Sequence, residues 1–264
     1  MARISIGAAD INYQIAGSGD EWLVLLHEIG GTLETWAAVA PALARRFRVL
    51  AYDQRGAGQS EKITGEFSIE TQVDDLRRLL DALGLSGPGH VAGVAIGAAI
   101  AMRFTARFPQ LMRSLVLACP APGVSADRVR YLGERASLVE QAGMAAVVES
   151  SLANSYPPAA IRDPAVYAAY KTRFLANDPT SYAAINRAFA RFDATPDLPA
   201  VSCPVLVLAG SHDRLRPPAF VREVALRIPG ARYAEIDSGH IMPVQAPQPM
   251  LAAMAGFYDA IATI

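Results

Sequence analysis

The stretch Gly93-Val94-Ala95-Ile96-Gly97 decides the fold. It follows the apolar run His90-Val91-Ala92 and opens a helical stretch at residues 98–104, so the pattern predicts a strand, a sharp turn and a helix. This is the context of a nucleophile elbow, Gly-x-Ser-x-Gly, in which the residue at the tip of the turn attacks the substrate. Ala95 stands where such an elbow has its serine. An ordinary strand-to-helix turn is the alternative interpretation, because short motifs also match by chance.

The alanine itself calls for an explanation. The central residue of an elbow is held at strained backbone angles, at a cost of about 1 to 3 kcal/mol for a residue other than glycine. A protein that does not need a hydroxyl there gains nothing from keeping an alanine in that strain. We therefore interpret Ala95 as an engineered replacement of a native serine. The rival interpretation is a natural protein with alanine at this position.

Short apolar runs alternate with helical periodicity along most of the chain. This alternation predicts an α/β fold, with a mostly parallel sheet and helices on both of its faces. The opening segment, residues 2–16, alternates like an antiparallel hairpin and is expected at a sheet edge. Helices are expected at residues 68–83 and 96–108. The expected core strands are residues 22–26, 47–52, 89–93, 113–118, 204–209 and 231–236.

Residues 120–199 break the alternation, because they contain helix-like segments and no convincing strand. Those segments are residues 125–141, 144–154, 164–176 and 179–192. A helical insertion between two core strands predicts a cap over the carboxyl edge of the sheet, where open α/β sheets bind ligands. We expect an α/β core of residues 1–119 and 200–264 and a helical cap of residues 120–199. The alternative is that these helices merely cover apolar surface.

Composition limits the function classes. The chain has 264 residues, of which 52% are hydrophobic and 19% charged, as in a compact globular protein. A formal net charge of -1 gives no basic field, so no nucleic acid partner is expected. No apolar run approaches the roughly 20 residues that span a bilayer, and the first residues lack the apolar core of a signal peptide. We expect a cytoplasmic protein without membrane contact that acts on a small molecule, and a homodimer is left open.

The cysteines and histidines give no sign of a metal site. Cys119 and Cys203 lie in strand-like segments and are expected to be buried free thiols, because two cysteines do not make a disulfide framework. The four histidines are scattered, and their spacing to the cysteines matches no zinc pattern. We expect no metal and no cofactor.

An acid and a base follow the elbow in chain order. Asp213 comes just past a predicted strand, and His240 comes after the last one. Nucleophile, acid and histidine in this order form the triad of elbow enzymes, in which the histidine is the general base and the acid orients it. Taken singly, Asp213 would be a loop cap and His240 a solvated loop histidine. The backbone amides of Ile96 and Ile29 are expected to form the oxyanion hole.

Several segments together point to one family. They are His27-Glu28-Ile29-Gly30-Gly31, residues 53–60, the elbow, Gly210-Ser211-His212-Asp213 and Ser238-Gly239-His240. Over essentially its whole length the chain resembles the α/β-hydrolase family. Residues 181–185, 197–198 and 204–207 are similar to the last cap helix and the re-entry strand of the 3-oxoadipate enol-lactonase-like branch.

The resemblance implies a cofactor-free, serine-type hydrolase of a small ester, lactone or related carbonyl compound. It would act through an acyl-enzyme at residue 95, so this chain with Ala95 is expected to be inactive. The alternative is a natural non-hydrolytic enzyme, or a ligand-binding protein of the same fold.

Candidate substrate-binding residues come from one loop and from the cap. Glu28 replaces the glycine usual in this family, and its carboxylate would repel an oxyanion unless it bonds into the loop or to a donor on the substrate. Arg187 is our choice for binding a substrate carboxylate, which a guanidinium does well. Tyr131, Phe174 and Phe189 are expected to line the pocket, with simple core packing as the alternative. The cap arginines considered with Arg187 are Arg128, Arg130, Arg135, Arg162, Arg173 and Arg191.

Overall fold

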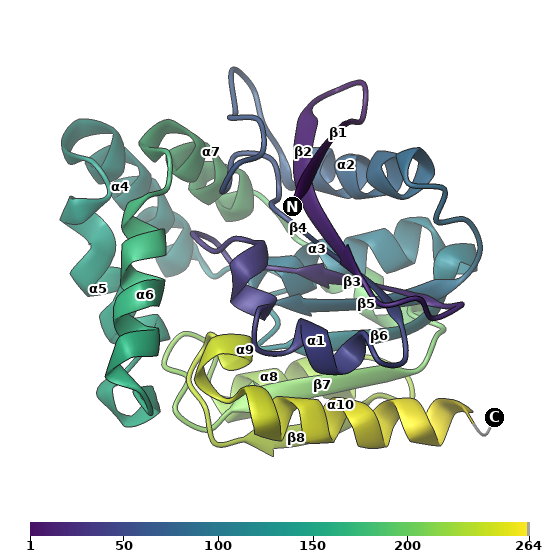
Figure 1. Cartoon of the computed structure of the whole chain (residues 1–264). Coiled ribbons are helices and arrows are strands. Elements are labelled where there is room, and N and C mark those ends of the chain that lie inside the picture. Colours follow the sequence, from purple (N-terminus) through teal and green to yellow (C-terminus); the bar gives the residue numbers. More distant parts are fainter. Residues whose placement is uncertain (263–264) are drawn as a thin grey trace.

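An eight-stranded sheet forms the centre of the computed structural model, which describes residues 1–262 (Figure 1). Its strand order is β1-β2-β4-β3-β5-β6-β7-β8. The hairpin of β1 and β2 pairs antiparallel with the rest at one edge, and the strands from β4 to β8 are parallel. This confirms the expected α/β fold with a mostly parallel sheet. The strand bounds are Ala2–Ser5, Asp10–Ala16, Trp22–Leu26, Arg48–Tyr52, Gly89–Val94, Met112–Ala118, Val205–Gly210 and Arg232–Ile236 for β1 to β8.

Helices on both faces bury the central strands, so β3, β5 and β7 are buried along their whole length and are mostly apolar. One core cluster packs α2 (Ile69–Ala82), α3 (Ile96–Arg107) and α8 (Pro218–Leu226) against the sheet. A second cluster packs α1 (Ala40–Leu43) and α10 (Pro247–Ala262) against the sheet. Shorter helical segments are η1 (Leu33–Trp36), η2 (Pro109–Leu111), η3 (Pro158–Ala160), η4 (Thr195–Ala200) and α9 (Met242–Gln245).

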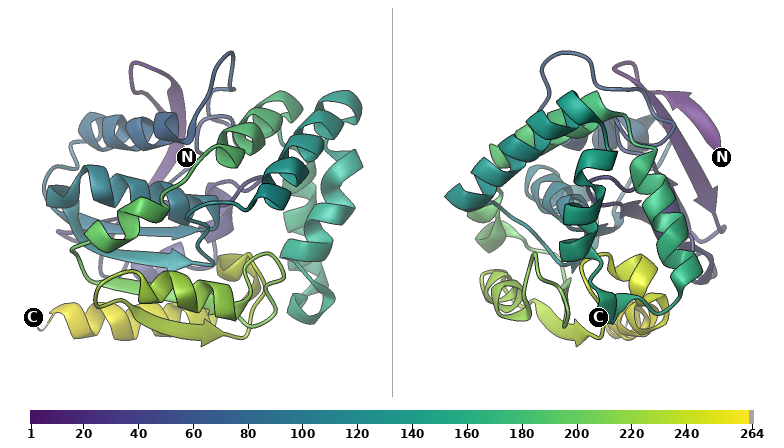
Figure 2. Two further views of the ribbon diagram at one scale, coloured as in Figure 1. Left: turned by 180° about the vertical axis from the view of Figure 1, so that it is seen from behind. Right: turned by 90° about the vertical axis from the view of Figure 1, so that its left-hand side faces the viewer.

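Between β6 and β7 the chain forms helices α4, α5, α6 and α7, which stand together beside one end of the sheet (Figure 2). Local sequence explains where two of them begin. Asp163 and Asp178 each cap a helix whose first residue is proline, and their carboxylates accept from the amides of Ala165 and Ser181 at 2.8 Å. The helix bounds are Ala126–Ala142, Ala145–Ser155, Pro164–Leu175 and Pro179–Ala190.

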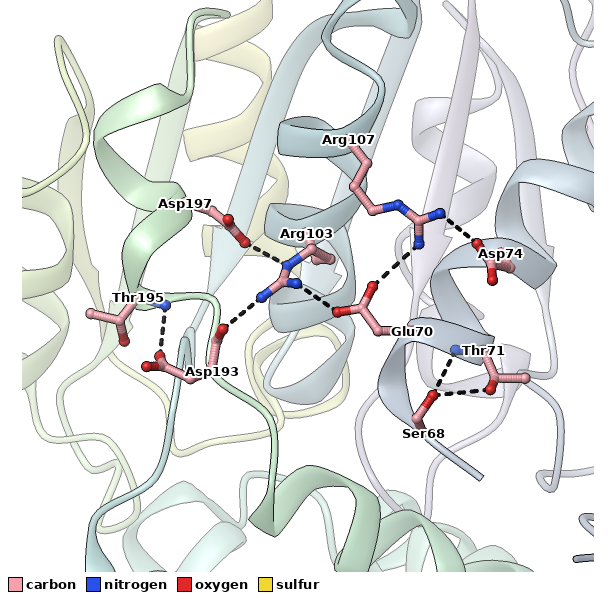
Figure 3. A network of polar contacts seen from close by, with 9 residues as sticks. All are labelled: Ser68, Glu70, Thr71, Asp74, Arg103, Arg107, Asp193, Thr195 and Asp197. Atoms are coloured by element: carbon pink, nitrogen blue, oxygen red, sulfur yellow. Dashed lines mark hydrogen bonds and ion pairs between the residues drawn. The ribbon is translucent and has the colours of Figure 1, made fainter. Parts of the chain in front are cut away.

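An arginine network holds the segment that returns from these helices to the sheet (Figure 3). Arg103 of α3 donates from Nε to Asp197 of η4, from Nη1 to Glu70 of α2, and from Nη2 to the carbonyl of Asp193, each at 2.6 Å. Arg107, one turn further along α3, donates to the same Glu70 at 3.2 Å. The start of the returning segment is therefore fastened to the helix that begins at the elbow.

Cys119 and Cys203 are both free, but each lies beside a strand and not in one, and Cys203 is only partly buried. Within residues 1–262, every helix is too short or too polar to cross a lipid bilayer.

Candidate active site

The turn between β5 and α3 has the strained geometry of an elbow. Ala95 lies at φ 54° and ψ -113°, a region that residues other than glycine seldom adopt. Its amide donates to the carbonyl of Ala118 at 3.0 Å. A side chain at Gly93 would collide with the backbone of Gly97, and one at Gly97 would collide with the carbonyl of Leu26. Both glycines are therefore needed for the close approach of strand and helix.

Asp213 and His240 come together beyond the ends of β7 and β8. The Oδ2 atom of Asp213 lies 2.7 Å from Nδ1 of His240, and both side chains are buried. The other oxygen of Asp213 accepts from the amides of Leu215 and Arg216 at 2.8 and 2.9 Å. Burial opposes ionisation of Asp213, but His240 and these two amides outweigh it and lower the pKa of the carboxyl group. This contact leaves Nε2 of His240 available for proton transfer.

A glutamine that the sequence did not single out supports the His240 loop. Gln245 accepts from the amide of Ile241 at 3.0 Å and donates to the carbonyl of Ser155 at 3.0 Å. The amide of His240 donates to the same carbonyl at 3.1 Å. The end of α5 therefore helps to position the histidine.

Cys119 stands next to this pair. Its backbone has φ 47°, and ligand atoms of Cys119, Asp213 and His240 all lie within 4.8 Å of one another. Burial, followed by the charge of Asp213, raises the pKa of the Cys119 thiol well above its ordinary value. A neutral thiol is a poor nucleophile and a poor metal ligand.

Glu28 is buried in the loop after β3. Its Oε1 accepts from the hydroxyl of Tyr170 at 2.8 Å and from that of Thr35 at 3.1 Å, while its Oε2 has no hydrogen-bond partner among the described residues. Burial, together with the charge of Glu28, raises the pKa of Tyr170 well above its usual range, so this hydroxyl remains a donor. The carboxylate therefore bonds both to its own loop and to helix α6.

One cavity brings most of the predicted residues together. A substrate carbonyl placed between Ala95 and His240 would lie near the start of α3, where the first amides have no intrahelical acceptor. Asp213 stands behind His240 and is not part of the cavity wall. The predicted residues that line the cavity are Glu28, Ile29, Ala95, Ile96, Phe174, Phe189 and His240.

Two predicted substrate-binding residues lie outside the cavity wall. Arg187 points to the exposed side of α7, where Glu140 accepts from its guanidinium at 2.6 Å. Tyr131 lies under the guanidinium of Arg128, 4.8 Å from ring centre to Cζ. The arginines of the cavity wall are instead Arg128, Arg135 and Arg216. The first two were among the cap arginines we considered, whereas nothing in the sequence had drawn attention to Arg216.

Comparison with known proteins identifies the family of the chain. The chain matches the profile of the α/β hydrolase fold over residues 21–247. It is 32% identical to a candidate carbamate hydrolase, RutD, from Azorhizobium caulinodans, over 95% of this chain and 96% of that protein.

Two solved structures are similar to this chain over nearly its whole length. The enol-lactonase from Burkholderia xenovorans LB400 is 29% identical, with a TM-score of 0.93 over 98% of this chain and 100% of that one. An esterase from Thermogutta terrifontis, solved with malate bound, is 26% identical, with a TM-score of 0.91 over 96% of this chain and 94% of that one.

Proposed function

Since this chain belongs to the α/β-hydrolase family, we propose that its site is built to hydrolyse a small ester, lactone or related carbonyl compound through an acyl-enzyme at residue 95. We further propose that the chain as it stands, with Ala95, does not form that intermediate. The observation that carries the proposal is that Ala95 is held in an elbow conformation and borders the same cavity as His240. The backbone of Ala95 has the conformation of an elbow nucleophile, but its side chain lacks the hydroxyl oxygen that would attack the substrate.

The roles follow from the geometry once a serine occupies position 95. Nε2 of His240 takes the hydroxyl proton as the oxygen attacks the carbonyl, and returns it to the leaving group. Asp213, bonded to Nδ1, keeps the imidazole in the required tautomer and stabilises its charged form. The amides of Ile96 and Ile29 donate to the oxyanion that develops on the former carbonyl oxygen. Water then releases the acid by the same path.

The relatives support this class of substrate. Their names describe a carbamate hydrolase, an enol-lactonase and an esterase, all of which attack a carbonyl carbon bonded to oxygen or nitrogen. The precise bond differs among them, so the proposal extends to the carbonyl group and not to one leaving group.

The experiment is the substitution Ala95→Ser. We expect hydrolysis of short acyl nitrophenyl esters or simple lactones by this variant and almost none by the present chain, because loss of a triad nucleophile lowers kcat by about a million-fold. Ala95→Gly is the matched control, since it changes the same position without adding a hydroxyl. A folded serine variant that hydrolyses no ester, lactone or amide in a broad panel would contradict the proposal.

A second candidate rests on Glu28. Its unpaired Oε2 is buried in the loop that also supplies Ile29, and the charge there disfavours an oxyanion. A natural protein with Ala95 would then use His240 as a base in a non-hydrolytic reaction, or would only bind its ligand. His240-dependent exchange of deuterium into a bound carbonyl compound, by the chain with Ala95, would favour this candidate over the first.

We propose a cytoplasmic protein that acts alone on its small-molecule substrate or as a homodimer. Light scattering of the purified chain distinguishes the two assemblies, and fractionation of the source cells tests the location.

A further inference from the structure

Glu28, in the wall of the candidate active site, has one carboxylate oxygen without a partner in the protein. The residue is only 2% exposed, and among the described residues no donor bonds to its Oε2 atom. A buried carboxylate oxygen without a hydrogen bond is unfavourable, because burial removes water and supplies nothing in its place. The protein therefore leaves one strong acceptor unsatisfied.

The two side-chain donors that reach Glu28 both bond to its other oxygen. Tyr170 of α6 donates to Oε1 at 2.8 Å, and Thr35 of η1 donates to the same atom at 3.1 Å. Each hydroxyl has a single hydrogen, so neither can also serve Oε2. The raised pKa of Tyr170 keeps that hydrogen in place. The donor for Oε2 therefore has to come from a bound molecule.

Close packing holds the carboxylate in position. A Cβ atom at Gly31 would collide with both carboxylate oxygens, so the glycine leaves the space that they occupy. The amide of Gly31 also donates to the carbonyl of Glu28 at 3.1 Å, which closes the turn of the loop. A preorganised acceptor of this kind loses little conformational entropy when a ligand bonds to it.

The position of Glu28 places this acceptor close to the expected reaction. Glu28 borders the same cavity as Ala95 and His240. The next residue is Ile29, whose amide is expected to bind the oxyanion, and consecutive Cα atoms are about 3.8 Å apart. A ligand group that bonds to Glu28 therefore belongs near the carbonyl that Ile29 binds.

We propose that Glu28 determines specificity, and that the ligand carries a hydroxyl or N–H group next to its reacting carbonyl, which donates to Oε2. This inference rests on the proposed function only in placing that carbonyl beside Ala95 and His240. A hydrogen bond to a carboxylate is stronger than one between neutral groups. A ligand of the same shape without the donor leaves the buried oxygen unpaired, so the site discriminates against it.

The same bond removes an obstacle to catalysis. An unpaired carboxylate beside the oxyanion hole opposes the negative charge that develops there. A hydroxyl or N–H group bonded to Oε2 brings the positive end of its dipole to the carboxylate and weakens this repulsion. The donor thus makes a buried carboxylate compatible with an oxyanion in the same cavity.

Pairs of ligands that differ only in the donor test the inference on the chain with Ala95, without turnover. Methyl lactate is compared with methyl isobutyrate, in which a methyl group replaces the hydroxyl. Methyl carbamate is compared with methyl acetate, in which a methyl group replaces the amino group. We expect NMR titration to show about tenfold or more tighter binding of the donor-bearing ligand in at least one pair, and the pair that responds identifies the donor as hydroxyl or N–H. Equal binding within both pairs, or no measurable binding of either donor-bearing ligand, would overturn the proposal.

The variant Glu28→Gln assigns the preference to this carboxylate. Its amide oxygen can still accept from Tyr170 and Thr35, but an NH2 group replaces Oε2. We expect the ratio of the two dissociation constants in the responding pair to fall to about one or to reverse. Glu34→Gln is the control, since Glu34 of η1 is not part of the cavity wall, and we expect it to keep the ratio of the unchanged chain.

An unchanged ratio in folded Glu28→Gln would contradict the proposal. The ligand pairs need only the unchanged chain, so the inference remains testable if this variant does not fold. The two proposals also fail separately. A preference for donor-bearing ligands with no hydrolysis by Ala95→Ser would remove the proposed hydrolysis and leave this inference standing. Hydrolysis by Ala95→Ser, with no such preference in either pair, would do the reverse.

Discussion

The hydroxyl of Tyr170 donates a 2.8 Å hydrogen bond to Oε1 of Glu28, and so joins helix α6 to the loop after β3. Both residues are buried and border the cavity. The bond fixes a carboxylate next to the loop that carries Ile29, and it connects the helices between β6 and β7 to the sheet.

We expect Tyr170→Phe to lower the free energy of unfolding by about 1 to 3 kcal/mol, because it leaves the buried carboxylate of Glu28 with only the hydroxyl of Thr35 as a donor. Urea unfolding of the chain and the variant measures this difference. Tyr167→Phe is the control, since Tyr167 lies on the same helix and packs edge-on against Tyr156. Equal effects of the two substitutions would show that the bond to Glu28 contributes nothing of its own.

In the Ala95→Ser background, we expect His240→Ala to lower kcat about as much as removal of the nucleophile, roughly a million-fold. Asp213→Asn should have a smaller effect, about ten-thousand-fold, because its role is orientation. Cys119→Ala is the control next to the pair, and its neutral thiol predicts a kcat within about tenfold of the parent. Steady-state kinetics on a nitrophenyl ester gives all three values, and near-parental turnover of the Asp213 variant would show that the acid is another residue.

Acid should remove the contribution of Asp213 to stability. Its pKa is lower in the folded protein than its ordinary value, so the unfolded chain binds more protons in the intervening range and stability rises with pH there. The contribution is complete above pH 5 or thereabouts and disappears as the pH falls through the folded pKa. We expect the difference in unfolding free energy between the chain and Asp213→Asn to shrink over that range. A difference in unfolding free energy that stays constant from about pH 6 to 2 would contradict this explanation.

The strain at residue 95 predicts an unusual response to glycine. Ala95→Gly should stabilise the chain or leave its stability unchanged, because relief of roughly 1 to 3 kcal/mol of backbone strain offsets the entropy cost of glycine. Ala101→Gly, in the middle of α3, should instead destabilise it by about 1 kcal/mol or more. Urea unfolding compares the two variants, and equal losses would mean that the turn is not strained.

We expect Arg103 to contribute more to the free energy of unfolding than Arg107 does. Arg103 is the less exposed and bonds to three partners, so Arg103→Met is expected to lower the unfolding free energy by about 1 to 3 kcal/mol. Arg107 is more exposed, and Arg107→Met should cost about 0 to 1 kcal/mol. Chemical denaturation distinguishes them, and a larger loss at Arg107 would contradict this ranking.

The fold was predictable because each central strand is a short apolar run between turn signals. The predicted runs at residues 22–26 and 89–93 coincide with β3 and most of β5, since burial on both faces makes such strands continuously apolar. The sharp turn was predictable for a similar reason. A close backbone approach requires glycine at positions 93 and 97, and both glycines are visible in the local sequence.

Contacts made across long stretches of sequence were not predictable. Glu28 and Tyr170 are 142 positions apart, and nothing in either segment indicates that α6 docks on the loop after β3. For the same reason, the sequence could not show that Arg128 and Arg135 line the cavity whereas Arg187 lies outside its wall. All three lie on helices between β6 and β7, and the side of a helix that faces the cavity depends on how the helices pack together. Arg216 lies in a loop, where no periodicity distinguishes an inward side chain from an outward one.

The backbone at Ala95 has a consequence for how this lineage can change. The unusual torsion angles lie between two close backbone approaches, at Gly93 and at Gly97, and the side chain of residue 95 makes no capping hydrogen bond. A single codon replacement at this position would place a hydroxyl in a setting that is already assembled. A single substitution at residue 95 can therefore add or remove the attacking hydroxyl, and neither change requires other residues to change.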